Sequence, residues 1–215
     1  MRIALIHALT HSIAPINEAF VQIWPSATRM NLLDDSLSAD LAANNGVLDE
    51  AMHHRFETLA DYAVACGADG ILFTCSAFGS CIERVARKHP QLPVLKPNEA
   101  MIAEAVSAAN QAIGLIASFA PTLVSMPPEF PANAVLRTEL VADAMDALNA
   151  GDMAAHDAAV VAAAMRLKAH NVGVIALAQF SMARAADAVA AATGLPVLTT
   201  PTTAIRLLKA RLNVA

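Results

Sequence analysis

One cysteine stands at a junction where enzymes often place reactive side chains. In the stretch ILFTCSAFG an apolar run stops at Thr74, Cys75 follows, and small residues then begin a predicted helix. Unpaired backbone N–H groups in the first turn of a helix stabilise a thiolate. The sequence therefore predicts a lowered pKa for Cys75 and a role as acid, base or nucleophile. The alternative is a small buried apolar residue, the commonest fate of a free cysteine.

The other two cysteines, Cys66 and Cys81, are expected to be packing residues. Three cysteines are an odd number, and the chain has no CxxC pair and no histidine at zinc-ligand spacing. We therefore expect no disulfide framework and no metal site. Because these cysteines are odd in number and unevenly spaced, a reducing cytoplasm is the expected setting. His7 and His11 interrupt the apolar N-terminal stretch, so we expect no signal peptide there.

The composition excludes several classes of protein. Of 215 residues, 56% are apolar and 15% charged, and the net charge is −5. There is no basic patch for nucleic acid and few aromatic residues on which bases would stack. The long uncharged run 105–128 is interrupted by polar residues and prolines, so we expect no membrane segment. The expected partners are small molecules and a second copy of the chain.

Short apolar runs alternate with longer stretches of helical periodicity. Predicted strands cover residues 2–8, 30–35, 70–74 and 92–96. The predicted helix 48–67 has Met52, Phe56, Leu59 and Ala63 on one face. Strand–helix–strand units with apolar strands indicate a parallel sheet that is covered on both faces.

The pattern occurs twice. GILF and LPVL, starting at Gly70 and Leu92, have counterparts starting at Gly173 and Leu195, 103 residues later in both cases. IALIHAL from Ile3 has its counterpart in IGLIASF, 110 residues later. We interpret this as a duplication of two α/β halves, too long in period for a solenoid.

In open parallel sheets, ligands bind beyond the carboxyl ends of the strands, and two facing halves would enclose a cleft there. At the end of the first strand, His7 has a suitable pKa for an acid/base, and the alternative is a hydrogen-bonded histidine that shapes the cleft. Other polar side chains near strand ends could hold a carboxylate, or simply cap helices. These candidates are Thr10, Thr74, Ser76, Ser118, Thr122, Gln179 and Ser181.

The stretch TCSAFG, the turn LIASFAPT and the two PVL strands, in this order, resemble the aspartate/glutamate/hydantoin racemase superfamily, which includes maleate isomerases and arylmalonate decarboxylases. The resemblance covers nearly the whole chain. It implies two pseudo-symmetric flavodoxin-like halves, no metal or organic cofactor, a small carboxylate substrate in the interdomain cleft, and a homodimer. It also implies that residues 1–97 form the first half with a C-terminal helix, 200–215, and that 98–199 form the second.

The sequence departs from that family in one important respect. Racemases of the family use two cysteines that face each other across the substrate. Here the counterpart of Cys75 is Ala178, or Gln179 if the alignment slides by one residue, and no cysteine follows Cys81. Neither an amide nor a nearby serine such as Ser181 carries a proton near neutral pH without a partner base.

A single cysteine leaves three mechanisms open. The thiol can deliver a proton to one face of an enediolate, as in decarboxylation, or add to a double bond that then rotates. Alternatively, His7 can serve as the second acid/base of a racemase. We therefore predict a cofactor-independent isomerase, racemase or lyase that acts at the carbon alpha to a carboxylate. The alternative from another class is a non-catalytic carboxylate-binding protein on the same fold.

Overall fold

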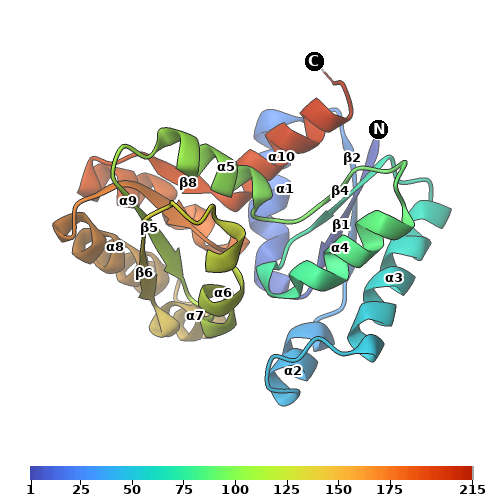
Figure 1. The fold of residues 1–215 in the computed structure, drawn as a ribbon, viewed down its shortest axis with the longest axis horizontal. Coiled ribbons are helices and arrows are strands. Elements are labelled where there is room, and N and C mark those ends of the chain that lie inside the picture. Colours follow the sequence, from blue (N-terminus) through green and yellow to red (C-terminus); the bar gives the residue numbers. More distant parts are fainter. Residues whose placement is uncertain (215) are drawn as a thin grey trace. The chain divides into compact units, whose positions relative to one another are not determined.

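The computed structural model describes residues 1–214, which form two compact units. The first unit contains Met1–Pro97 and the segment from Ala204 onward, and the second contains Asn98–Thr203. Each unit is an α/β structure built on one four-stranded sheet. Figure 1 shows the two sheets and the helices around each of them.

The first sheet is entirely parallel, with strand order β2-β1-β3-β4. Its central strands β1 and β3 are almost wholly buried, as their apolar sequences predicted. The strand after β1 ends earlier than predicted, so Asp34 lies in the following turn. The strands are β1 (Arg2–His7), β2 (Thr28–Leu33), β3 (Gly70–Phe73) and β4 (Val94–Leu95).

The second sheet repeats this arrangement, with strand order β6-β5-β7-β8 and all pairs parallel. The predicted pair of pseudo-symmetric parallel-sheet halves is thus confirmed. One strand, β6, was not predicted, because its residues are largely exposed and form no apolar run. The strands are β5 (Ala112–Ala117), β6 (Leu136–Leu140), β7 (Val172–Leu177) and β8 (Val197–Thr199).

Helices and short 3-10 turns connect the strands. In the first half these are η1 (Thr10–Ser12), α1 (Ile13–Ile23), α2 (Ser36–Ala43), α3 (Glu50–Ala65), η2 (Ser76–Phe78) and α4 (Gly79–Lys88). In the second half they are α5 (Glu99–Ala108), α6 (Ala120–Ser125), η3 (Pro127–Glu129), α7 (Ala142–Asn149), α8 (Met153–Ala169), η4 (Phe180–Ala185) and α9 (Ala186–Thr193). The last helix, α10 (Thr200–Arg211), leaves the second unit and joins the first. No helix within residues 1–214 is long and apolar enough to cross a membrane.

The second sheet buries both of its faces, as expected for a parallel sheet. Successive strand residues point to opposite faces, so Leu115 belongs to one apolar cluster and Ile116 to the other. Helices α8 and α9 cover the side of Ile116, and α5 covers the side of Leu115. Both faces therefore hold the strands rigidly, and the residues that follow the strands inherit that rigidity.

Helix α3 begins where its sequence predicts, because Asp49 accepts a hydrogen bond from the Met52 N–H and caps the helix. Its buried face differs in one position from the prediction. Ala60 is fully buried, whereas Leu59 is only half-buried. The small Ala60 side chain allows a close approach to the core, which side-chain hydrophobicity alone does not indicate.

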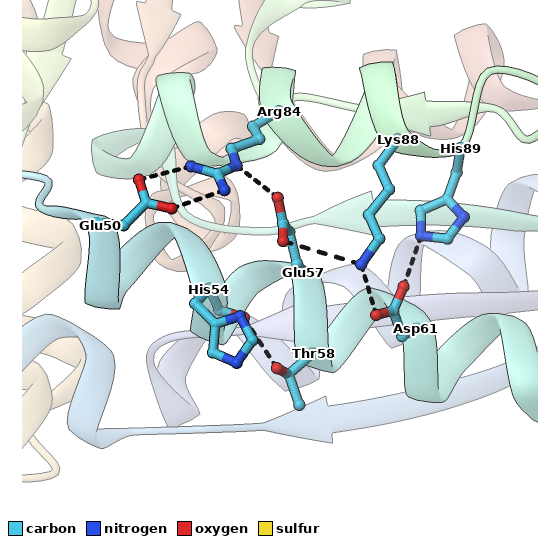
Figure 2. A network of polar contacts seen from close by, with 8 residues as sticks. All are labelled: Glu50, His54, Glu57, Thr58, Asp61, Arg84, Lys88 and His89. Atoms are coloured by element: carbon cyan, nitrogen blue, oxygen red, sulfur yellow. Dashed lines mark hydrogen bonds and ion pairs between the residues drawn. The ribbon is translucent and has the colours of Figure 1, made fainter.

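A network of charged side chains joins α3 to α4 (Figure 2). Arg84 on α4 binds Glu57 on α3 at 2.5 Å, and Lys88 Nζ lies 2.7 Å from Asp61 Oδ2. The hydrogen bond from Lys88, with a weaker effect of His89, lowers the pKa of Asp61. Helix α4 follows the turn that carries Cys75, so the network helps to fix that turn.

Candidate active site

Cys75 lies at the carboxyl end of the first sheet, between β3 and the turn η2. Its backbone is extended, with φ of −126° and ψ of 124°, and the chain turns immediately after it. The Cys75 side chain keeps part of its surface accessible, whereas Cys81 is fully buried in the core. Strand end, turn and partial exposure together place the thiol where parallel-sheet proteins bind ligands.

The pKa of Cys75 differs from the prediction. The Ala77 N–H does interact with the thiol in the predicted, pKa-lowering sense, but burial has the larger effect and raises the pKa to about 11. Within the first unit, the space lined by Cys75, His7 and Phe56 is too narrow for a water molecule. The thiol is therefore protonated at neutral pH in the free protein.

His7 is fully buried at the end of β1, and both of its ring nitrogens are engaged. Nδ1 lies 2.9 Å from Thr74 Oγ1, and Nε2 lies 3.0 Å from Asn31 Oδ1. Because an amide oxygen only accepts, Nε2 carries the proton, and Thr74 donates its hydroxyl proton to Nδ1. Burial lowers the pKa of His7, against a smaller opposite effect of the Asn31 contact. This arrangement matches a neutral histidine that holds the residue next to Cys75.

Asn31 was missed by reasoning from the sequence. It lies on β2 directly beside Leu5 of β1, and it also accepts a hydrogen bond from Asn17 Nδ2 at 3.0 Å. An amide side chain between Met30 and Leu32 of this strand was the available signal. A hydrogen-bonded polar group therefore lies next to Cys75, with His7 and Thr74 buried and Asn31 exposed at its outer end.

The other candidates of the first half are placed differently from one another. Ser76 is buried in the turn directly after Cys75. Thr10 is exposed on η1. Asp34, which follows β2, is ion-paired with Arg55 at 2.7 Å. Burial opposes ionisation of Asp34, but the hydrogen bonds of Ser36 and Arg55 outweigh it and lower the pKa.

The structure identifies Gln179 as the counterpart of Cys75. Thr74 N donates to Ile6 O at 3.0 Å, and in the second unit Ala178 N donates to Ile116 O at 2.9 Å. Ala178 thus matches Thr74, and Gln179, like Cys75, has an extended backbone before a 3-10 turn. The two alignments arose because the pairing of β5 with β7 shifts between Ala112 and Ile113, leaving one extra residue in β7.

The Gln179 side chain is held at this strand end. Its Oε1 accepts hydrogen bonds from the Ser118 hydroxyl at 3.0 Å and from the Ser118 N–H. The donors that were expected to hold a carboxylate are therefore occupied by an amide oxygen. Thr122 and Ser181, the remaining candidates of this half, are both buried near the same sheet edge.

His156, at the start of α8, lies inside the protein and not on a solvated helix face. The ring is fully buried, and Nδ1 lies 2.7 Å from Asp157 Oδ1. Asp157 is also bound by Arg184 of η4, at 2.8 Å. The pair fixes η4, the turn that follows Gln179. Within residues 1–214 no group of three or more His, Cys, Asp or Glu side chains could hold a metal ion.

Several solved racemase structures have a fold similar to that of this chain. The structure aligns with an allantoin racemase from Klebsiella pneumoniae over 100% of this chain and 89% of that chain, with 18% identity and a TM-score of 0.72. A glutamate racemase from Bacillus anthracis aligns over 98% of this chain and 81% of its own, with 12% identity and a TM-score of 0.75. An aspartate racemase from Picrophilus torridus aligns over 97% of this chain and 93% of its own, with 12% identity and a TM-score of 0.72.

This chain has the aspartate/glutamate racemase fold. No family model matches the sequence, and no curated protein matches it. At identities this low, the likeness shows the racemase fold alone. The reaction depends on the residues that follow the strands. In this racemase fold, one of the two equivalent strand ends carries Cys75 and the other carries Gln179.

Proposed function

We propose that this chain is an isomerase/racemase-type enzyme of the Asp/Glu/hydantoin racemase superfamily, acting at the carbon alpha to a carboxylate of a small molecule. The observation that carries the proposal is the position of Cys75, a partly exposed residue at the carboxyl end of β3 with the Ala77 N–H beside its thiol. The similar structures, by their titles, are racemases of allantoin, glutamate and aspartate, which supports this class of reaction.

Cys75 acts as a proton donor to one face of the substrate. Its raised pKa keeps the thiol protonated, which suits donation and does not suit removal of a proton by the free enzyme. The enediolate forms when the minor thiolate form of Cys75 takes the α-proton, or when one carboxylate leaves as carbon dioxide. In the donating step the S–H bond breaks, a C–H bond forms at the α-carbon of the enediolate, and a thiolate remains. Because burial disfavours that thiolate, it readily takes a proton back, either from the α-carbon in reverse or from water.

The second half does not supply a matching proton carrier. Gln179 stands at the equivalent strand end, and an amide does not titrate near neutral pH. One-face chemistry also serves a decarboxylase-type lyase, our second enzyme candidate. There the bond to one carboxylate breaks, carbon dioxide leaves, and the resulting enediolate takes the Cys75 proton. Thiolate addition to a double bond, with rotation, requires the same single cysteine.

A non-catalytic carboxylate-binding protein is the alternative from another class. The raised pKa of Cys75 and the lack of a thiol at its counterpart Gln179 favour it over a two-thiol racemase, because neither position then supplies a thiolate. A cytoplasmic location and a homodimeric state belong to the proposal as family-level expectations, and light scattering tests the latter.

One experiment separates these possibilities. Thermal-shift screening with small mono- and dicarboxylates selects ligands, and each enantiomer of each hit is then incubated in D₂O and followed by proton NMR. We expect α-hydrogen exchange, or protonation of a decarboxylated product, to be strongly biased to one hand. Tight binding without exchange, isomerisation or loss of carbon dioxide would establish the carboxylate-binding protein instead. Equal racemisation of both enantiomers would contradict the one-face mechanism.

A further inference from the structure

A second hollow lies at the amino-terminal edge of the second sheet, at the opposite end of β5 from Ser118. Its volume is about 360 Å³, within the range of small-molecule sites. The end of α5, the start of β5 and the loop before β6 line it, and Figure 1 shows where these elements lie in the chain. We propose that this hollow, here called the amide hollow, binds a small uncharged molecule that carries an amide or ureide group.

The polar lining of the amide hollow consists of three carboxamide side chains, Asn110, Gln111 and Asn133. No charged side chain lines it. All three residues are exposed, and within residues 1–214 none of their carboxamides has a hydrogen-bond partner in the protein, so each is open to a ligand. Each offers one acceptor oxygen and two donor hydrogens, a combination that pairs with the donor and acceptor of an amide or ureide.

The surroundings of the carboxamides select against anions. Helix α5 ends at Ala108, and Val106 and Ala109, at this C-terminal end, line the hollow. The C-terminal end of a helix carries partial negative charge, so it disfavours a carboxylate and favours a hydrogen-bond donor. Apolar side chains, Val106, Ile113 and Val135, supply the rest of the lining. The expected ligand therefore has an apolar body and an uncharged polar group.

The backbone at the rim is shaped to admit one of the carboxamides. The shift in register between β5 and β7 places Gly173 as an extra residue opposite Ala112, which lines the hollow. A Cβ atom at Gly173 would lie 2.7 Å from Asn110 Oδ1, closer than any real contact. Glycine at this bulge is what lets the Asn110 amide lie against β7. Bulges of this kind are common beside binding sites.

The two halves of the chain differ at this place. In the first unit, Leu208 and Leu212 of the C-terminal segment pack over Gly70. At the 103-residue spacing of the repeat, the second half has Ala105 and Ala109 at these positions. Val174 occupies the position that Gly70 has in the first sheet, because it pairs with Ile113 as Gly70 pairs with Ile3. The valine side chain is smaller than the two leucine side chains that the second half lacks, so it fills only part of their volume. A leucine at position 109 would project into the hollow.

The test compares the binding of uncharged molecules with that of anions of similar shape. Nicotinamide, phenylurea and uracil are titrated into ¹⁵N-labelled protein, and nicotinate and benzoate serve as the anions. We expect at least one uncharged molecule to shift the side-chain amide signals of Asn110, Gln111 and Asn133 saturably, and the anions to leave them unmoved. Ala109→Leu should abolish the shifts. Ala108→Leu adds the same group to an exposed α5 position outside the hollow and should keep them.

The outcomes are distinct. Absence of shifts with all three uncharged molecules, shifts that persist in Ala109→Leu, or equal shifts with the anions would each overturn the proposal. Both variants are checked by their thermal unfolding midpoints, so loss of binding in a folded Ala109→Leu protein is attributable to the filled hollow. The readout is binding and does not require that the proposed reaction at Cys75 takes place.

Discussion

Gln179 Oε1 accepts both hydrogen-bond donors of Ser118, the backbone N–H and the hydroxyl. The two residues are 61 positions apart and meet because β5 and β7 are neighbours that end at the same sheet edge. An amide oxygen thus occupies donors that we expected to hold a carboxylate of the ligand. The second strand end of this chain is therefore satisfied internally before any ligand arrives.

Replacing Gln179 should change what this strand end can do. Gln179→Ala leaves Ser118 with unpaired donors, and we expect a loss of about 1 kcal/mol in the free energy of unfolding, with tighter binding of carboxylates to the freed donors.

Gln179→Cys should also add racemase activity, because it restores a thiol at the counterpart of Cys75. Urea unfolding and ligand titration measure the first effects, and polarimetry measures the last.

The control for this prediction is Ala178→Cys. Ala178 matches Thr74 in its backbone hydrogen bond and is buried in the core, so a thiol there should give no racemase activity. If Ala178→Cys racemises and Gln179→Cys does not, the structural equivalence of Gln179 and Cys75 is wrong.

Cys75→Ala should lower turnover by a factor of at least about 10² while leaving the fold intact, because the variant lacks the proposed proton donor. Cys66→Ala is the matched control, since Cys66 only ends helix α3 and should be dispensable for activity. Steady-state kinetics and circular dichroism measure the two properties. Full activity of Cys75→Ala would remove the thiol from the mechanism.

Alkylation of Cys75 should have an alkaline pH dependence. Burial raises its pKa to about 11, so in the free protein the reactive thiolate fraction grows until about that pH. Iodoacetamide labelling between pH 6 and pH 11, read by peptide mass spectrometry, measures this. Rapid labelling of Cys75 at pH 6 would mean instead that the N–H groups of the turn outweigh burial, as the sequence alone had suggested.

His7 should make stability depend on pH in a specific window. Its pKa is lowered in the folded protein, so the unfolded chain binds a proton more readily. The stability that His7 provides is therefore complete above about pH 6.5 and decreases as the pH falls below that value. His7→Gln should be less stable by about 1–3 kcal/mol at pH 7.5, through unpaired groups on Thr74 and Asn31, and should lack this pH dependence.

The same variant distinguishes the two roles of His7. If the histidine only holds the Cys75 turn, exchange of the α-hydrogen in D₂O should weaken without changing its preference for one enantiomer. Selective loss of exchange in one enantiomer would instead make His7 the second acid/base.

The parts of the fold that depend on local apolar patterns could be predicted from the sequence. Strands β1, β3, β5 and β7 are buried on both faces, and their uninterrupted apolar runs marked them. Edge strand β6 could not be found in this way, because Arg137, Thr138 and Glu139 give it no such run. Edge strands need only one covered side, so their sequences are less distinctive.

The candidate site was predictable in position and not in chemistry. The rule that ligands bind beyond strand ends located Cys75 and Gln179. The pKa of Cys75 depends on the packing of distant residues such as Phe56, which no local pattern reveals. The partners of His7 on β2 and beside β3 required the strand order, because they are 24 and 67 positions away.

The crossing of α10 from the second unit to the first has a consequence for biosynthesis. The second unit is one continuous stretch, Asn98–Thr203, so a ribosome completes it before the segment from Ala204 appears. Most of the first unit is synthesised earlier, but its core is complete only when Leu208 and Leu212, which cover Gly70, have been added. The half of the protein that carries Cys75 is therefore begun first and finished last. Until then the part of its sheet around Gly70, on the central strand β3, is an apolar surface that can lead to aggregation of the nascent chain.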